Sequence, residues 1–247
     1  MPASESSLLE PPPLQFWLLG RCEIHVRGLP LPPPRYRKEW WLLALLVLGH
    51  DREHSRDSLA AAFWPESDTD RALLYLRRSL TNLRRALGAE AARLSSPTPR
   101  TLRLDLSGAF ADVVAFDQAL RKIPSRPRLE EALARAVDLY QGPLLPDCDD
   151  AWVLPEREER AQSYLAALEG LAQRATEAGD PATAVHWLRR LVSADPGRES
   201  ACGALMAALA AGGTAPPSRR STRTCAGCSA RTSTRTPPRR PKNSISA

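Results

Sequence analysis

The chain lacks the features that mark membrane and secreted proteins. Its longest apolar run, WLLALLVLG (Trp41–Gly49), is far shorter than the ~20 apolar residues that cross a bilayer. The N-terminal stretch MPASESSLLEPPP has neither the basic start nor the apolar centre of a signal peptide. The cysteines number five, an odd count, and are spread widely, so they do not indicate a disulfide framework. We therefore expect a cytoplasmic protein with reduced thiols and no membrane partner.

Motifs that hold nucleotides or perform acyl transfer are also missing. There is no G-x-x-x-x-G-K-[ST] loop and no G-x-S-x-G elbow. The histidines form no H-E-x-x-H or similar cluster, and the C-x-x-C of Cys225–Cys228 lacks the two further ligands that zinc needs. Asp147, Asp149 and Asp150 are better placed to cap a helix beginning near Ala151 than to bind a metal. The sequence thus predicts no catalytic residue, no metal and no cofactor, and we expect that the protein is not an enzyme.

The net charge of +6 conceals an uneven distribution. From Thr214 onward the chain has seven arginines, one lysine and no acid, so residues 1–213 together carry −2. Within that body, residues 1–113 carry +2 and residues 114–213 carry −4. Local charge is therefore more informative than the overall pI.

The first half of the chain predicts strands, three helices and a hairpin, in that order. Two apolar or alternating runs, at residues 14–19 and 22–26, indicate a small strand meander that ends at prolines 32–34. Helical patterns follow over about residues 37–48, 55–64 and 68–87, with Ser55 and Asp68 or Thr69 as caps. The strand-like pieces TLRLDL and AFADV then occupy residues 101–113. This order describes a winged helix-turn-helix, whose helix-turn-helix pair is the second and third helices.

The third helix has one apolar side and one basic side. Leucines recur at helical spacing on the side that we expect to face the core, namely Leu73, Leu76, Leu80, Leu83 and Leu87. Five arginines and no acid lie between Arg71 and Leu87. A solvated amphipathic helix would account for the leucines, but such helices usually mix charges of both signs for i,i+4 support. The acid-free outer side therefore favours a polyanionic partner, double-stranded DNA.

The outer side chains have the chemistry needed to read DNA. Arginine can bond guanine edges through two N–H groups, asparagine can do the same with adenine, and flanking arginines can neutralise phosphates. The side chains predicted to face bases are Arg71, Tyr75, Arg78, Asn82 and Arg85. Those predicted to bind phosphates are Arg77, Arg84, Arg100 and Arg103.

From Val114 the pattern is continuously helical. An antiparallel helix pair is expected to break at Gly179-Asp180 and to end at Pro196. The stretches EAGD and AAGG end their helices about 33 residues apart, close to the ~34-residue spacing of tetratricopeptide repeats. We therefore expect an all-α helical-repeat domain over residues 114–213, whose last helix lacks a partner.

The two ends of the chain are expected to lie outside these domains. Residues 1–13 are predicted to be disordered. Residues 214–247 are either a disordered basic arm with non-specific phosphate affinity or a translation in the wrong frame. With GC-rich codons and a shift of two nucleotides, residues 224–243 become approximately LRRLLRADLHPDPAPETQE, an amphipathic helix that could partner the last repeat helix. We favour the frameshift, which sequencing of the gene would decide.

Several stretches resemble one known family. Residues 14–113 look like the OmpR-type winged-helix domain of the antibiotic regulatory protein (SARP) family of bacterial transcription activators, through LLALLVLG, SRDSLAAAFWPESD and RRSLTNLRRALGA. Residues 112–213 resemble the bacterial transcriptional activator domain that follows it in this family. Those stretches are DVVAFDQAL, LYQGPLLPDCDDAWVLPEREERAQSYLAALEGLA and WLRRLVSADPGRESACGALMAALAAGG. Gly-Pro-Leu-Leu-Pro followed by Asp-Asp-x-Trp is the most specific marker.

The resemblance implies a use for each domain. The helix Arg71–Leu87 would enter the major groove, and Thr101–Val113 would supply the wing, near Arg100 and Arg103. The helical-repeat domain would mediate self-association or contact RNA polymerase. We therefore expect a transcription activator that binds DNA as a homodimer on two half-sites. The alternatives are a helical-repeat scaffold whose winged helix binds protein, and a truncated, non-functional fragment of a regulator that continues into a module such as an ATPase.

Overall fold

The computed structural model describes residues 11–32, 34, 36–121 and 128–213. The predictions for the basic or frameshifted tail, and for most of the N-terminal segment, lie outside the described residues. The chain forms two compact units that divide between Ala167 and Leu168. Across the described ranges, no helix is both long and apolar enough to cross a membrane.

The first unit begins with a four-stranded sheet in the order β3-β2-β1-β7. Its strands are β1 (Leu14–Trp17), β2 (Glu23–Val26), β3 (Leu29–Pro30) and β7 (Phe110–Ala111). β1 pairs antiparallel with β2, and β7 pairs parallel with β1 so that Ala111 lies opposite Phe16. Leu14 and Phe16 lie on the same side of β1, and both are fully buried. The predicted meander is confirmed, and a strand from far along the chain extends it.

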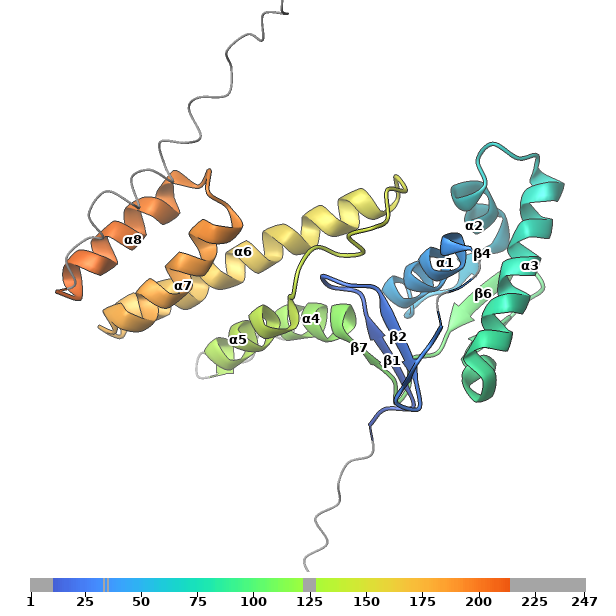
Figure 1. The fold of residues 1–247 in the computed structure, drawn as a ribbon, viewed down its shortest axis with the longest axis horizontal. Coiled ribbons are helices and arrows are strands. Elements are labelled where there is room, and N and C mark those ends of the chain that lie inside the picture. The colour runs from blue at the N-terminus through green and yellow to red at the C-terminus, as the bar shows by residue number, and fades with distance from the viewer. Residues whose placement is uncertain (1–10, 33, 35, 122–127, 214–247) are drawn as a thin grey trace, which may run out of the picture. The chain divides into compact units, whose positions relative to one another are not determined.

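Three helices follow in the predicted order (Figure 1). They are α1 (Arg37–Leu48), α2 (Arg56–Phe63) and α3 (Thr69–Leu87), and α3 packs against both α1 and α2. The predicted caps are present: the Ser55 hydroxyl accepts the N–H of Ser58 at 3.4 Å, and the Asp68 carboxylate accepts the N–H of Arg71 at 2.9 Å. Each cap satisfies one of the N–H groups that a helix start leaves free.

The wing differs from its prediction. A 3-10 helix (η1, Gly88–Arg93) leads into a three-stranded sheet in the order β4-β6-β5, formed by β4 (His54–Ser55), β6 (Thr101–Leu104) and β5 (Leu94–Ser95). TLRLDL therefore pairs with Leu94–Ser95 and not with AFADV, which supplies β7 to the first sheet. The stretch SSPTPR is the turn of the hairpin, where the hydroxyls of Thr98 and Thr101 lie 2.7 Å apart. The predicted wing at Thr101–Val113 is therefore wrong in its second half: the wing hairpin is formed by β5 and β6. The sequence did not predict β5 because a strand of two residues shows no alternation of apolar and polar side chains.

The core of the first unit continues past the predicted domain boundary at residue 113. The chain passes from β7 directly into α4 (Asp112–Arg121), then into α5 (Leu129–Leu139) and the start of α6 (Val153–Glu177) (Figure 1). Phe116, Leu144, Leu145 and Val153 are buried in the same apolar cluster as the leucines of α1 and α3. The boundary between residues 113 and 114 stays a prediction, but the packing does not break there.

The Gly-Pro-Leu-Leu-Pro stretch docks on the end of β1. The Leu145 N–H donates to the Leu18 carbonyl at 2.9 Å, and the Gly20 N–H donates to the Pro143 carbonyl at 2.9 Å. The Arg157 guanidinium donates to three carbonyl groups of this loop at 2.6 to 2.8 Å, those of Leu144, Leu145 and Cys148. These bonds satisfy the backbone of a loop whose leucines are buried. The Gly-Pro-Leu-Leu-Pro stretch, the most specific marker of the family resemblance, therefore has a structural role: it joins the helical region to β1.

The acids of the following stretch do not act as expected from the sequence. The helix α6 begins at Val153 rather than near Ala151. The Asp150 carboxylate accepts the indole N–H of Trp152 at 3.3 Å, and its backbone carbonyl accepts the Val153 N–H at 3.1 Å. Asp150 therefore holds the start of the helix by its backbone, while its side chain fixes a tryptophan.

The close approach at Gly20 gives a stability prediction. Gly20 has a φ of +82°, and a Cβ there would lie 2.7 Å from the backbone carbonyl carbon of Gln141. Gly20→Ala should lower the free energy of unfolding by about 2–4 kcal/mol, the sum of left-handed strain and overpacking. Gly28 is the matched control because its φ is +79° with nothing within 4 Å of an added Cβ. Urea denaturation should show a loss of only about 1 kcal/mol for Gly28→Ala; equal losses would contradict a tight joint at Gly20.

The second unit is helical throughout its described residues. It contains the end of α6, α7 (Pro181–Ala194) and α8 (Glu199–Ala211), and α7 packs against α8. The predicted break is confirmed: Gly179 has a φ of +73°, and the Asp180 carboxylate accepts the Thr183 N–H at 3.0 Å to cap α7. An ion pair of 3.2 Å between Arg198 and Glu169 joins the start of α8 to α6. The fold is mainly α, a winged helix followed by a helical domain of the tetratricopeptide-like kind.

Candidate DNA-binding surface

The two sides of α3 differ as the leucine spacing predicted. Four of the five predicted core leucines are buried, namely Leu76, Leu80, Leu83 and Leu87. Leu73 is only half-buried and lines a cavity beside the helix. The exposed side chains of the opposite side are Arg71, Leu74, Arg77, Arg78, Thr81 and Arg85. From Arg71 onward no acid lies among them, although Asp70, in the first turn of α3, is also exposed.

Three of the five predicted base-facing residues lie on this exposed side. They are Arg71, Arg78 and Arg85. The guanidinium of Arg71 is 3.9 Å from the Asp68 carboxylate, but both side chains are 66% exposed, so the pair is weak. Within the described chain, Arg78 and Arg85 form no ion pair with an acid. Their guanidinium groups are therefore available to a ligand.

The other two predicted base-facing residues turn toward α1 and α2. The Asn82 amide nitrogen donates to the Glu39 carboxylate at 2.7 Å, and Glu39 is only 3% exposed. The Tyr75 ring lies 6.1 Å from the ring of Trp64. Because a buried carboxylate needs a donor, Asn82 has a structural role that competes with the reading of bases. A contact of either residue with DNA stays a prediction.

The predicted phosphate ligands separate in the same way. Arg77, Arg100 and Arg103 are exposed. Arg84, in contrast, donates through Nε and Nη2 to the Leu94 carbonyl at 3.3 and 3.0 Å, and Nη2 also lies 3.5 Å from the Ser96 hydroxyl. Arg84 therefore ties α3 to the wing, while Arg77 and Arg100 line one cavity beside the helix.

The structure adds one basic residue that sequence reasoning missed. Arg56, at the start of α2, donates through Nη2 to the Ser96 hydroxyl of the wing at 2.9 Å, and its backbone N–H donates to the Arg100 carbonyl at 2.9 Å. Burial lowers the pKa of Arg56 below its ordinary value, and the nearby charges of Arg84 and Arg77 lower it further. No local signal could have selected Arg56, because the pairing of β4 with β6 brings it to the wing.

One apolar residue on the exposed side of α3 was also passed over. Leu74 is 57% exposed and lies among the arginines. The sequence alone could have pointed to Leu74, because an apolar side chain on the basic side of a helix breaks the amphipathic pattern. A leucine in that position can contact the methyl group of thymine, as other apolar side chains do in the major groove.

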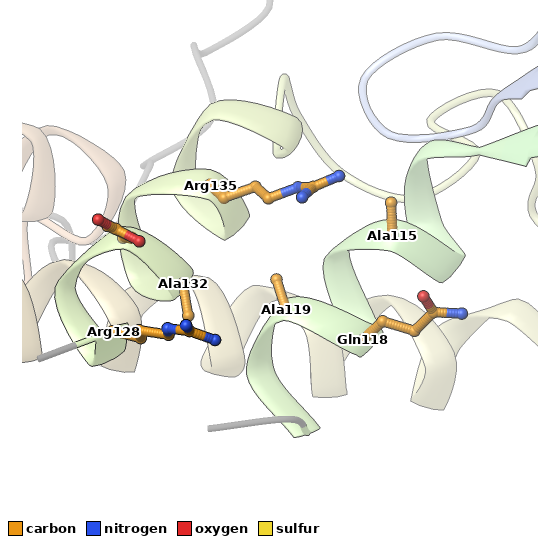
Figure 2. Close-up of a pocket in the computed structure, with 7 residues that line it drawn as sticks. Ala115, Gln118, Ala119, Arg128, Ala132 and Arg135 are labelled. Carbon is orange, nitrogen blue, oxygen red and sulfur yellow. The ribbon is translucent and has the colours of Figure 1, made fainter. Parts of the chain in front are cut away.

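A separate hollow lies between α4 and α5 (Figure 2). Its volume is about 370 Å³, and it is lined by Ala115, Gln118, Ala119, Arg128, Glu131, Ala132 and Arg135. Figure 2 shows Arg128, just before α5, and Arg135, in α5, extending toward α4, which carries Ala115 and Ala119. The lining has no nucleophile and no histidine, and no group of three or more metal-ligating side chains occurs in the described part of the chain. We assign no chemistry to this hollow.

The basic helix, its cap and its wing define the class of fold, a winged helix followed by a helical region. Residues 110–216 match the family described as bacterial transcriptional activator domain. Over about three quarters of its length, the chain is also similar to SARP-type bacterial transcriptional regulators.

Comparisons with known proteins agree with this assignment. The chain is 30% identical over 202 residues to the transcriptional regulatory protein MoaR1 of Mycobacterium tuberculosis, a match that covers 76% of this chain and 63% of MoaR1. It is 27% identical to the transcriptional regulatory protein EmbR of the same species, over 75% of this chain and 50% of EmbR. It is 29% identical to the regulatory protein AfsR of Streptomyces coelicolor, over 79% of this chain and 20% of AfsR. The chain thus spans less than two thirds of each of these relatives.

A solved structure has the same fold. The structure of Mycobacterium tuberculosis EmbR in complex with a low affinity phosphopeptide superposes with a TM-score of 0.65 and 23% sequence identity. The match covers 82% of this chain and 56% of that chain. The likeness concerns the fold alone.

Proposed function

We propose that this regulator activates transcription by binding double-stranded DNA, with α3 in the major groove. The observation that carries the proposal is the exposed side of α3 from Arg71 onward, which has no acid and where Arg78 and Arg85 form no ion pair among the described residues. An α-helix fits the major groove, and arginine reads guanine there through two parallel hydrogen bonds. Arg71, Arg78 and Arg85, with Leu74 and Thr81, are the side chains that would face base edges.

The wing side of α3 would hold the DNA backbone. Arg77 and Arg100 line the same cavity there, and Arg103 projects from β6. Contacts of this kind fix the register of a protein on the duplex without reading sequence. Tyr75 and Asn82 would support the helix from its other flank through Trp64 and Glu39.

The helical region would connect DNA binding to transcription. The match of residues 110–216 to the bacterial transcriptional activator domain supports self-association or contact with RNA polymerase as its role. One winged helix offers a small recognition surface, so we propose that two copies bind two half-sites. The joint between β1 and the Gly-Pro-Leu-Leu-Pro loop, built from backbone hydrogen bonds, would fix the start of the helical region to the winged helix.

The dependence of binding on salt tests the proposal. We expect the full chain to select a duplex from a random-sequence pool and to bind it with an affinity that falls steeply as salt rises. With about four phosphate contacts, the affinity should fall about 100-fold between 50 and 200 mM salt, because bound cations are released from the duplex. Fluorescence anisotropy with the selected duplex measures this slope. Failure to enrich any duplex, or an affinity that salt does not change, would favour the protein-binding scaffold instead.

A further inference from the structure

A cationic cavity lies between the start of α2, the middle of α3 and the wing. Its volume is about 440 Å³, and its lining residues are Arg56, Asp57, Leu73, Leu76, Arg77, Pro99 and Arg100. Three arginines therefore face one aspartate in a space that could hold a small anionic group. None of the three forms an ion pair with an acid in the described part of the chain.

Arg56, which lines this cavity, has a buried hydrogen-bonding group without a partner among the described residues. Arg56 uses Nη2 for the Ser96 hydroxyl, but its Nε is fully buried and has no acceptor among the described residues. Buried N–H groups in native structures almost always have a partner, which is a protein group, a water or a ligand, so this donor has room for an acceptor from outside the described residues. Burial lowers the pKa of Arg56, and the positive charges of Arg84 and Arg77 lower it further.

The arginines around the cavity differ in how firmly hydrogen bonds hold their side chains. Arg84 is already bound to the Leu94 carbonyl and reaches the Ser96 hydroxyl that Arg56 also binds. Ser96 thus joins α2 and α3 to the wing through two guanidinium groups. Arg77 and Arg100 are exposed at the rim. The hydrogen bond to Ser96 therefore holds the side chain of Arg56, whereas the side chains of Arg77 and Arg100 are exposed to solvent.

We propose that this cavity binds one phosphate group of the DNA backbone and that Arg56 is its central ligand. The proposal rests on the proposed DNA-binding function and adds a residue that the basic face of α3 does not contain. Phosphate oxygens accept paired hydrogen bonds from guanidinium groups, which matches both the charge and the unused Nε of Arg56. A phosphate there would also order the wing, because Arg56 and the wing share Ser96.

The test pairs a protein variant with a neutralised phosphate. Arg56→Gln is expected to bind the selected duplex about 10-fold more weakly and to lower the salt slope by about one phosphate contact. A series of duplexes, each with one neutral methylphosphonate, should contain one position that weakens wild type by a similar factor and leaves Arg56→Gln unchanged. Arg56→Lys should regain part of the affinity, whereas Arg189→Gln, on the exposed surface of α7, should bind as wild type does.

The outcomes separate this proposal from the proposed function. If wild type binds the duplex and every methylphosphonate weakens wild type and Arg56→Gln equally, Arg56 does not hold a phosphate although the DNA-binding function stands. If wild type binds no duplex, both fail. A thermal shift with inorganic phosphate, compared with chloride at equal ionic strength, addresses a free anion. Stabilisation of wild type but not of Arg56→Gln, without any phosphonate-sensitive position, would assign the cavity to free phosphate and overturn its assignment to DNA.

Discussion

Arg78→Ala combined with Arg85→Ala is expected to weaken DNA binding by about 100-fold or more while leaving the fold intact. Arginine contacts with base edges are worth about 1–3 kcal/mol each, so two of them are worth about 2–6 kcal/mol, and the middle of this range exceeds about 100-fold. Both side chains are exposed and neither is in an ion pair among the described residues, so their removal costs the folded state little. The loss should therefore appear in the dissociation constant and not in the melting temperature.

The measurement needs a control for charge and a control for the helix. Arg189→Ala removes an exposed positive charge from α7 and should leave the dissociation constant unchanged. Asn82→Ala should instead lower the melting temperature, because it removes the donor from the buried Glu39 carboxylate. If the double arginine variant binds the selected duplex as tightly as wild type does, α3 is not the recognition helix.

The sequence correctly predicted those parts of the winged helix that depend on interactions between residues close together in the chain. The bounds of α1, the Ser55 and Asp68 caps, and the buried side of α3 all follow from residues within one or two turns of one another. Caps and helical periodicity act over such distances, so they are visible in a single sequence. The predicted and observed elements agree there for that reason.

The parts that the sequence could not predict depend on contacts between distant residues. Asn82 meets Glu39 across 43 positions, and Arg56 meets Ser96 across 40. Strands of two residues, such as β4 and β5, carry too few side chains to alternate, and pairing across the sheet decides their register. The candidate site was therefore located on the right helix, while the orientation of its flanks and the identity of Arg56 required the structure.

The continuation of the core past residue 113 also has a non-local cause. The residues that join the two regions bind through backbone groups, as in the contacts of Gly20 with Pro143 and of Leu18 with Leu145. Backbone hydrogen bonds leave no chemical signature in a sequence, although the close approach of Gly20 and Gly142 explains why small residues stand there. The match to the activator domain begins at residue 110, in β7, inside the packed unit that includes the winged helix.

Asp112 is the residue whose replacement is expected to affect stability most. It is 1% exposed, and its carboxylate accepts the backbone N–H groups of Leu18 and Leu19 at 2.9 Å and of Val113 at 2.7 Å. Asp112→Ala would leave these three buried donors without an acceptor. At about 1–3 kcal/mol for each of the three orphan donors, the loss in the free energy of unfolding should be about 3–9 kcal/mol. Such a loss would remove much of the stability of a typical domain.

Urea denaturation of the full chain measures this loss, and an exposed aspartate provides the comparison. Asp105 accepts the N–H and the hydroxyl of Ser107 in a solvent-exposed turn, so Asp105→Ala should change the unfolding midpoint far less. The pH dependence gives a second readout. Burial raises the pKa of Asp112 above its ordinary 3.8, although the N–H groups of Leu19, Leu18 and Val113 oppose the rise.

The sign of that pH dependence follows from proton binding. Since the folded state holds the Asp112 proton more tightly than the unfolded state does, the contribution of this carboxyl to stability is largest at low pH. The advantage of wild type over Asp112→Ala should therefore shrink as the pH rises from about 4 through the raised pKa, and then remain constant. An advantage that grows over the same window would mean that the three N–H groups outweigh burial and hold the carboxylate ionised. A variant as stable as wild type at every pH would show that the winged helix and the region beginning at residue 110 are not joined through this side chain.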